Sequence, residues 1–122
     1  MVQLLKTRFK TEGLSVTSTS ADASADVLYT VPSNYSSEIK FLHLSNGGNS
    51  SKKAYVQFYH ADDSSYYYIA NGVSMAGHSV LDLTGQTYFH LHQSDKIVVY
   101  KESGMTLDVV VSIEEFYNPL RG

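Results

Sequence analysis

Apolar residues alternate with polar ones along much of this chain, and that spacing constrains the fold more than any other feature. The clearest run has Leu107, Val109, Val111 and Ile113 at every second position. Side chains two residues apart in an extended strand point to the same face, so this run predicts a long strand with one buried face. No window keeps the 3.6-residue spacing of an amphipathic helix. The pattern therefore predicts an all-β protein.

Shorter runs predict the other strands. Residues 27–31 and 54–59 alternate in the same way, while residues 38–45 carry apolar side chains first on one face and then on the other. A β-bulge near Phe41, which adds one residue to the strand, would reconcile the two faces. The predicted core consists of the apolar side chains on the inward faces: Val27, Val31, Leu42, Leu44, Val56, Phe58, Leu81, Leu83, Ile97, Val99, Leu107, Val109, Val111 and Ile113.

Glycine, asparagine and serine mark the breaks between strands. Asn46-Gly47-Gly48-Asn49 predicts a hairpin loop, Asn71-Gly72 and Ser103-Gly104 predict tight turns, and Ser94-Asp95 predicts a turn into the next strand. Strands that follow one another this closely are typical of sandwiches and jelly rolls. We therefore expect a single domain over residues 1–122, an antiparallel β-sandwich of jelly-roll type with eight or nine strands.

The two ends of the chain suit contacts with other subunits. Residues 1–10 carry Lys6, Arg8 and Lys10 on one side and Gln3, Leu5, Thr7 and Phe9 on the other. We therefore expect residues 1–12 to form an extended N-terminal arm that adds a strand to a neighbouring subunit and meets an acidic partner. Residues 117–122 form a C-terminal tail that leaves the last strand through a proline. Ends without such a role are the alternative. The candidate contact residues at the two ends are Leu5, Phe9, Tyr117 and Leu120.

Composition excludes several classes of protein. The 122 residues carry a formal net charge of −3, which argues against binding to nucleic acid through charge alone. Because cysteine is absent, the chain forms no disulfide, thiolate metal site or cysteine nucleophile. No apolar run reaches the roughly 18 residues of a membrane span, and the basic N-terminal segment lacks the apolar stretch of a signal peptide.

No local motif predicts an enzyme. The serine elbow GxSxG, the P-loop and GxGxxG are all absent. His90 and His92 point the same way on one predicted strand, with His78 as a candidate third ligand, so a metal-dependent enzyme is one hypothesis to test. We interpret the two histidines as a surface pair and Asp62-Asp63 as a solvated turn. We therefore expect no cofactor, no metal and no catalytic residue.

Tyrosine is the most unusual feature of this composition. The chain has ten tyrosines, and three of them, Tyr66-Tyr67-Tyr68, are consecutive. Alternation places Tyr66 and Tyr68 on one face and Tyr67 on the other, so one group must be exposed or meet a partner. Tyrosine combines a large rigid ring with a polar tip and is enriched at interfaces. Cross-strand packing within the sheet, a protein interface and a carbohydrate site all remain open.

Several motifs occur in a telling order. Residues 28–35 (LYTVPSNY) place a Val-Pro-Ser-Asn turn before a strand that ends at Asn46, and Ser94-Asp95-Lys96-Ile97 opens a later strand. In this order the chain, over about residues 27–115, resembles small all-β virion proteins of tailed bacteriophages. The motifs also have physical roles, because Pro32 fixes a turn and Asp95 can close one. The likeness carries no catalytic signature.

The resemblance implies a non-enzymatic structural protein of the virion, made in the host cytoplasm. Its expected role is capsid decoration or a head–tail or tail accessory subunit, and its expected partners are further copies of itself and capsid, neck or tail proteins. No direct contact with nucleic acid or membrane is expected. The alternative is a lectin-like carbohydrate-binding module for host recognition, in which the tyrosines and Asp62, Asp63 or Asn71 hold a glycan.

Overall fold

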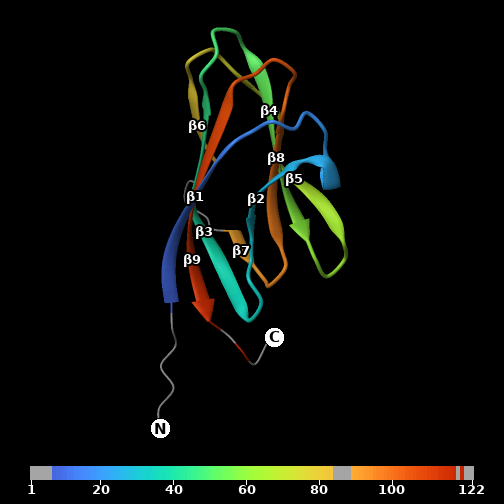
Figure 1. The fold of residues 1–122 in the computed structure, drawn as a ribbon, viewed down its shortest axis with the longest axis vertical. Coiled ribbons are helices and arrows are strands. Elements are labelled where there is room, and N and C mark those ends of the chain that lie inside the picture. Colours follow the sequence, from blue (N-terminus) through green and yellow to red (C-terminus); the bar gives the residue numbers. More distant parts are fainter. Residues whose placement is uncertain (1–6, 84–88, 118, 120–122) are drawn as a thin grey trace.

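Two antiparallel sheets packed face to face make up the fold (Figure 1). A computed structural model describes residues 7–83, 89–117 and 119, and the described residues contain nine strands and no α-helix. The prediction of an all-β antiparallel sandwich is therefore confirmed. The described residues contain no helix that could cross a membrane.

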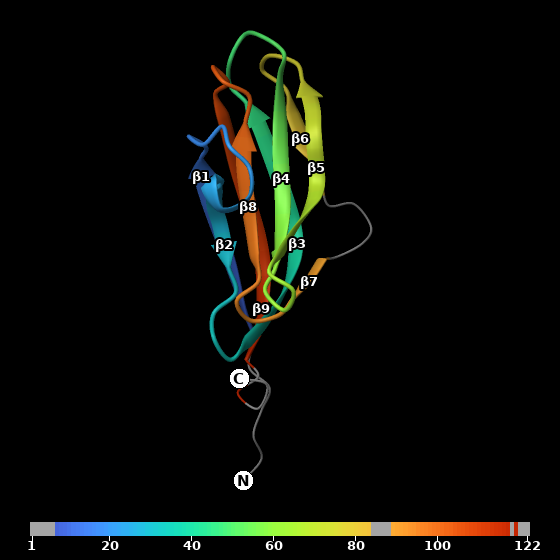
Figure 2. The ribbon, with the colours of Figure 1, turned by 90° about the vertical axis from the view of Figure 1, so that its right-hand side faces the viewer.

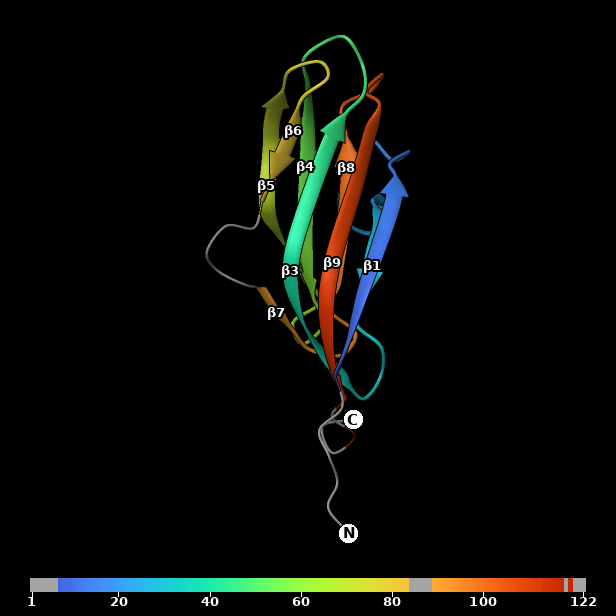
Figure 3. The ribbon, with the colours of Figure 1, turned by 90° about the vertical axis from the view of Figure 1, so that its left-hand side faces the viewer.

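The first sheet is shown in front in Figure 3, and the second sheet is in front in Figure 2. The first has the order β1–β9–β3–β6. Strand β7 pairs with the same edge of β3 as β6 does, but near the beginning of β3, whereas β6 pairs near its end. Its strands are β1 (Thr7–Ser15), β3 (Tyr35–Asn46), β6 (Val80–Asp82), β7 (Phe89–Leu91) and β9 (Leu107–Tyr117). The second has the order β2–β8–β4–β5. Its strands are β2 (Asp26–Thr30), β4 (Lys52–His60), β5 (Ser65–Met75) and β8 (Lys96–Lys101).

The hydrophobic core lies between the two sheets, where the alternating positions of the strands meet. Most of the predicted core is buried there, including Val31, Leu42, Leu44, Val56, Ile97, Val99, Leu107, Val109, Val111 and Ile113. Phe58, Leu81 and Leu83 are partly buried and pack against it. Val27 was predicted to be buried, and this is wrong because the residue is 49% exposed. The pairing of β2 with β8 shifts after Val27, and the shift places Leu28 and Tyr29 inside instead.

The predicted β-bulge near Phe41 is confirmed. The pairing of β3 with β9 shifts between Ile39 and Phe41, so Lys40 is the extra residue. Because of the shift, Ile39 and Leu42 both point into the core, although an unbroken alternation would send them to opposite faces.

Two of the predicted turns take a different form. The loop after Asn46 is not a hairpin, because β3 belongs to the first sheet and β4 to the second. The chain crosses between sheets here, and the Asn46 side chain donates hydrogen bonds to the carbonyls of Ser50, Met75 and Ala76 at 3.1–3.2 Å. Asn71-Gly72 is not a turn either, because both residues lie inside β5. Gly72 has a φ of 72° at an irregularity in the pairing of β5 with β4, and glycine takes this conformation without strain.

The N-terminal strand pairs within the chain. Thr7 to Ser15 run antiparallel to β9 over their whole length, so residues 7–12 are an edge strand of the first sheet and not a free arm. The basic side chain of Arg8 meets Glu115 of the same chain, where a partner subunit was expected to supply the acidic group. The alternation of residues 7–12 thus reflects an ordinary strand. Residues 1–6, including Leu5, lie outside the described residues.

Candidate functional site

Five tyrosines gather on the outer face of the second sheet, and we call this group the tyrosine face. Tyr55 and Tyr59 come from β4, Tyr66 and Tyr68 from β5, and Tyr100 from β8. The strand register brings them together, since Tyr59 lies opposite Tyr66 and Tyr55 lies opposite Tyr100. The expectation that Tyr66 and Tyr68 share a face is therefore confirmed. Sequence reasoning missed Tyr100, whose strand has four consecutive apolar residues and gives no alternation to interpret.

The rings of the tyrosine face hold one another in place. Tyr55 stacks on Tyr100 with ring centroids 4.3 Å apart, and the hydroxyl groups of Tyr68 and Tyr100 are 2.5 Å apart. Burial and the hydrogen bond with Tyr68 raise the pKa of Tyr100 well above its usual value. Tyr59 packs on Tyr66 at 4.7 Å, and the Lys96 ammonium lies 5.4 Å from the Tyr59 ring centroid. Cross-strand packing therefore orders these side chains.

One part of the tyrosine face is covered by the chain itself. The segment between β1 and β2, with the short helical turn Asp22–Ser24, packs on this face through Ala21 and Ala25. The buried Gln57 amide fixes the segment, because its oxygen accepts from the Asp22 N–H at 2.9 Å and its nitrogen donates to the Asp22 carboxylate at 2.8 Å. This cover explains why all four residues from Ile97 to Tyr100 are buried.

The other part of the face remains open. Tyr68 is 44% exposed, and Asn71, which lies opposite Tyr55 in the register, is exposed as well. An aromatic ring with an adjacent amide offers both apolar contact and hydrogen bonding to a partner. The tyrosine face is therefore a candidate binding surface whose rings are ordered before any partner arrives.

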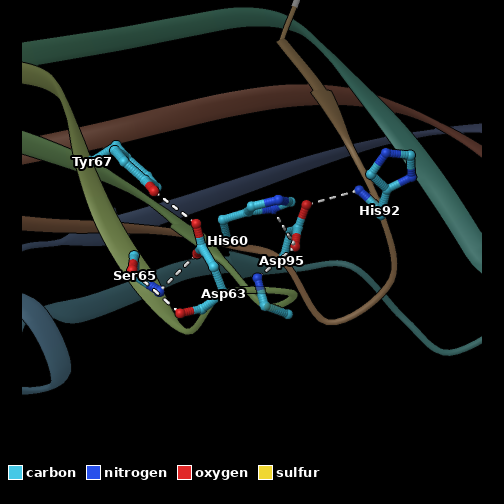
Figure 4. A network of polar contacts seen from close by, with 7 residues as sticks. His60, Asp63, Ser65, Tyr67, His92 and Asp95 are labelled. Atoms are coloured by element: carbon cyan, nitrogen blue, oxygen red, sulfur yellow. Dashed lines mark hydrogen bonds and ion pairs between the residues drawn. The ribbon is translucent and has the colours of Figure 1, made fainter.

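Tyr67 points to the other face of β5 and joins a polar network at the end of the sandwich (Figure 4). It is 50% exposed, and its hydroxyl donates to the Asp63 carboxylate at 2.7 Å. The same carboxylate accepts from the Ser65 N–H at 3.0 Å. These hydrogen bonds, that of Tyr67 first, lower the pKa of Asp63. The prediction that Asp62-Asp63 forms an exposed turn is confirmed.

A buried carboxylate next to that turn ties three segments together. Asp95 accepts hydrogen bonds from the backbone N–H groups of Ala61 and His92, both at 2.9 Å (Figure 4). Its backbone carbonyl accepts from the Val31 N–H, also at 2.9 Å. The His60 ring nitrogen Nδ1 is buried without a hydrogen-bond partner and lies 3.6 Å from the same carboxylate. Asp95 closes the turn before β8, as the sequence predicts, and also joins that turn to the β4–β5 turn.

The histidines of the metal hypothesis do not converge. His90 and His92 share a strand end with ring centroids 5.2 Å apart, but the His78 ring binds the Asn49 side chain at 2.6 Å in another loop. Within the part of the chain that the structure describes, no three His, Cys, Asp or Glu side chains are placed to hold a metal ion. His78 is therefore not the third ligand of the pair.

A buried carboxylate in the core is the polar feature that sequence reasoning missed. Glu115 is fully buried and accepts hydrogen bonds from Arg8 Nε and from the Tyr29 hydroxyl, each at 2.5 Å. Since the phenol proton goes to Glu115, the Ser37 hydroxyl donates to Tyr29 at 2.6 Å. The sequence held a signal, because alternation places Glu115 on the inward face with Ile113 and a buried carboxylate requires donors.

The electrostatics of this cluster favour the ionised carboxylate. Burial alone would raise the pKa of Glu115, but the hydrogen bonds from Tyr29 and Arg8 and the arginine charge outweigh it, so the pKa lies below its usual value. Burial, and then the bond to Glu115, raise the pKa of Tyr29. The Arg8 guanidinium also lies 4.4 Å from the Tyr35 ring centroid. These contacts make the cluster a structural clamp between β1, β2, β3 and β9.

The remaining candidate contact residues lie apart from the tyrosine face. Phe9 is 75% exposed on the outer face of the first sheet. Tyr117 packs on Tyr35 with ring centroids 5.4 Å apart. Leu120 lies outside the described residues.

No protein-family model matches the chain, and no curated protein matches it significantly.

Proposed function

We propose that this protein is a non-enzymatic structural subunit of a tailed-phage virion, which assembles through protein contacts as a capsid decoration or a head–tail or tail accessory subunit. The proposal rests on the motif order of residues 27–115 and on one structural observation, the tyrosine face. There, stacked and hydrogen-bonded rings lead to an open part at Tyr68 and Asn71.

Rigid aromatic surface is well suited to binding a protein. Ordering a flexible side chain on binding costs about 0.5–1.5 kcal/mol, and the Tyr68 hydroxyl is already held by Tyr100. Tyrosine is also among the residues that most often dominate the binding free energy of an interface. We therefore expect Tyr68 to carry a large share of the affinity.

Co-sedimentation with purified particles that lack the wild-type protein tests the proposal. We expect the wild type to bind and Tyr68→Ala to bind at least tenfold more weakly, because losing a dominant interface residue costs about 2 kcal/mol or more. Tyr67→Ala is the matched control, since this neighbour is similarly exposed, at 50% against 44%, and lies on the other face of β5. If the wild type fails to bind, the structural role is wrong. If both variants bind like the wild type, the tyrosine face is not the contact.

Copy number in purified virions then separates the two roles. A copy number comparable with that of the major capsid protein indicates decoration, whereas a small fixed number indicates the neck or tail. Quantitative mass spectrometry of intact particles measures it.

A carbohydrate-binding function is the second candidate, and the exposed pair of Tyr68 and Asn71 favours it. A sugar ring stacks on an aromatic side chain while an amide binds its hydroxyl groups. Asp63 is used differently from the expectation, because it binds Tyr67 on the other face. Binding to a glycan array that is lost in both Tyr68→Ala and Asn71→Ala, together with no binding to particles, would favour this function.

A further inference from the structure

Within the described residues, strand β1 leaves one long edge of the first sheet open. It ends the strand order there, pairs with β9 alone among the described strands, and lies at the margin of the sheet in Figure 3. Seven of its nine residues are exposed, and the other two, Glu12 and Leu14, are partly buried. An open edge presents N–H and C=O groups that can pair with another strand.

Neither packing nor backbone conformation in the described structure requires a glycine at position 13, the seventh residue of β1. A Cβ atom there would lie 3.9 Å from the Val109 carbonyl oxygen and 4.0 Å from Val110 Cγ2, which is ordinary contact. Its φ is not positive either. Glycine inside a strand weakens the strand and often marks a place where another molecule or backbone approaches closely. The residue is therefore better explained by a neighbour outside the chain.

We propose that two copies of this chain pair edge to edge through β1, antiparallel about a twofold axis at Thr11. In this register Lys10 of each copy lies opposite Glu12 of the other, and Phe9 lies opposite Gly13. The exposed Phe9 ring then covers the glycine, an arrangement known to stabilise edge glycines. Lys10 and Glu12 already share a face, with Lys10 Nζ and Glu12 Oε2 3.3 Å apart within one chain. The inference rests on the proposed assembly role and names the partner at this edge.

The charges of β1 select this register over its neighbours. A shift of the axis to Lys10 would place two lysines opposite each other, although it would also bring Arg8 opposite Glu12, and a shift to Glu12 would place two glutamates opposite each other. Like charges directly opposite in a sheet are destabilising, whereas opposite charges stabilise. Of these three alignments, the one centred on Thr11 has no like-charge pair and two opposite-charge pairs.

Cysteine cross-linking tests the axis directly, because the chain has no cysteine of its own. Residues opposite each other in an antiparallel pair have Cα atoms about 4.5–5.5 Å apart, within the range of a disulfide. We expect Thr11→Cys to form a disulfide-linked dimer under mild oxidation. Ser15→Cys, which lies on the same strand and face but opposite Thr7, is the matched control and should remain monomeric. Equal cross-linking of both variants, or of neither, would overturn the proposal.

Charge exchange gives an independent test in solution. Lys10→Glu and Glu12→Lys each place like charges opposite one another, so we expect each alone to self-associate about tenfold more weakly than the wild type. An equimolar mixture restores both opposite-charge pairs and should associate again, as measured by sedimentation velocity, with circular dichroism as the check on folding. A mixture no better than the single variants would contradict the register. Particle binding is scored separately. Single variants that self-associate like the wild type, with particle binding by the wild type intact, would reject this inference alone, whereas a wild type that does not bind particles would reject the assembly role.

Discussion

Replacing the buried Glu115 by glutamine tests whether the clamp at the end of the core depends on charge. The amide has nearly the same shape as the carboxylate, and its oxygen can still accept one hydrogen bond. What is lost is the negative charge that faces the Arg8 guanidinium and the Tyr29 hydroxyl. The variant therefore separates charge from packing.

The expected loss of stability is about 1–2 kcal/mol at neutral pH. A hydrogen bond to a charged group contributes about 1.5–3 kcal/mol, against about 0.5–1.5 kcal/mol for a neutral one, so the Tyr29 bond alone accounts for about 1 kcal/mol. The Arg8 contact adds less than a buried pair would, because half of the arginine side chain is in solvent. For a domain of this size the loss corresponds to roughly 3–8 °C in Tm.

The effect should depend on pH in one direction. The pKa of Glu115 is lowered in the folded protein, so its ionised form stabilises the fold above the ordinary pKa of about 4.3. That contribution is lost as the pH falls through the lowered folded pKa. Glutamine does not titrate there. The difference in unfolding free energy between wild type and Glu115→Gln should therefore shrink below about pH 4.

Urea unfolding followed by tyrosine fluorescence at a series of pH values measures this difference. Glu114→Gln is the matched control, since Glu114 lies on the opposite face of β9 with its carboxylate 3.4 Å from Lys40 Nζ. We expect the control to change stability by less than about 0.5 kcal/mol. An equal loss in both variants, or a Glu115→Gln difference that persists unchanged at low pH, would refute the electrostatic explanation.

Four further variants probe other parts of the fold by urea unfolding and circular dichroism. Val111→Ala truncates a fully buried side chain and should lower the unfolding free energy by roughly 1–3 kcal/mol. Asp95→Asn should cost about 1–2 kcal/mol, because an amide has one acceptor oxygen where two backbone N–H groups are bound. Gly72→Ala should cost about 1–2 kcal/mol, because alanine is strained at a φ of 72°. The double variant His90→Ala/His92→Ala should keep its Tm, and zinc bound stoichiometrically by the wild type but not by this variant would contradict it.

Alternation predicted the strands well, because burial between two sheets requires a spacing of two residues. It failed where the backbone departs from that spacing. Val27 was assigned to the core because the shift in β2 after it leaves no mark in residue types. Asn71-Gly72 was assigned to a turn because a positive φ is needed both in turns and in irregular strands. Residue types predict the backbone conformation at such a position, but pairing with neighbouring strands determines whether the position lies in a turn or inside a strand.

Contacts between distant segments were hardest to predict. The glycine-rich loop after Asn46 correctly indicated that the chain reverses direction. The crossing to the other sheet, however, is fixed by hydrogen bonds from the Asn46 side chain to the carbonyls of Met75 and Ala76. Tyr100 was missed because the segment that covers it comes from the other end of the sequence. Pairing such as that of Arg8 with Glu115 requires the register of β1 and β9, which alternation alone leaves open.

The central place of β9 in the first sheet affects how the chain folds during synthesis. β9 lies between β1 and β3, yet it follows all eight other strands in chain order. While the ribosome is still making the chain, β1 and β3 lack their common neighbour, and their apolar positions remain open to other molecules. Contacts that join distant parts of a chain form slowly and leave such surfaces exposed meanwhile. Premature termination before Leu107 should therefore yield an aggregation-prone product, while folding of the first sheet waits for translation of β9.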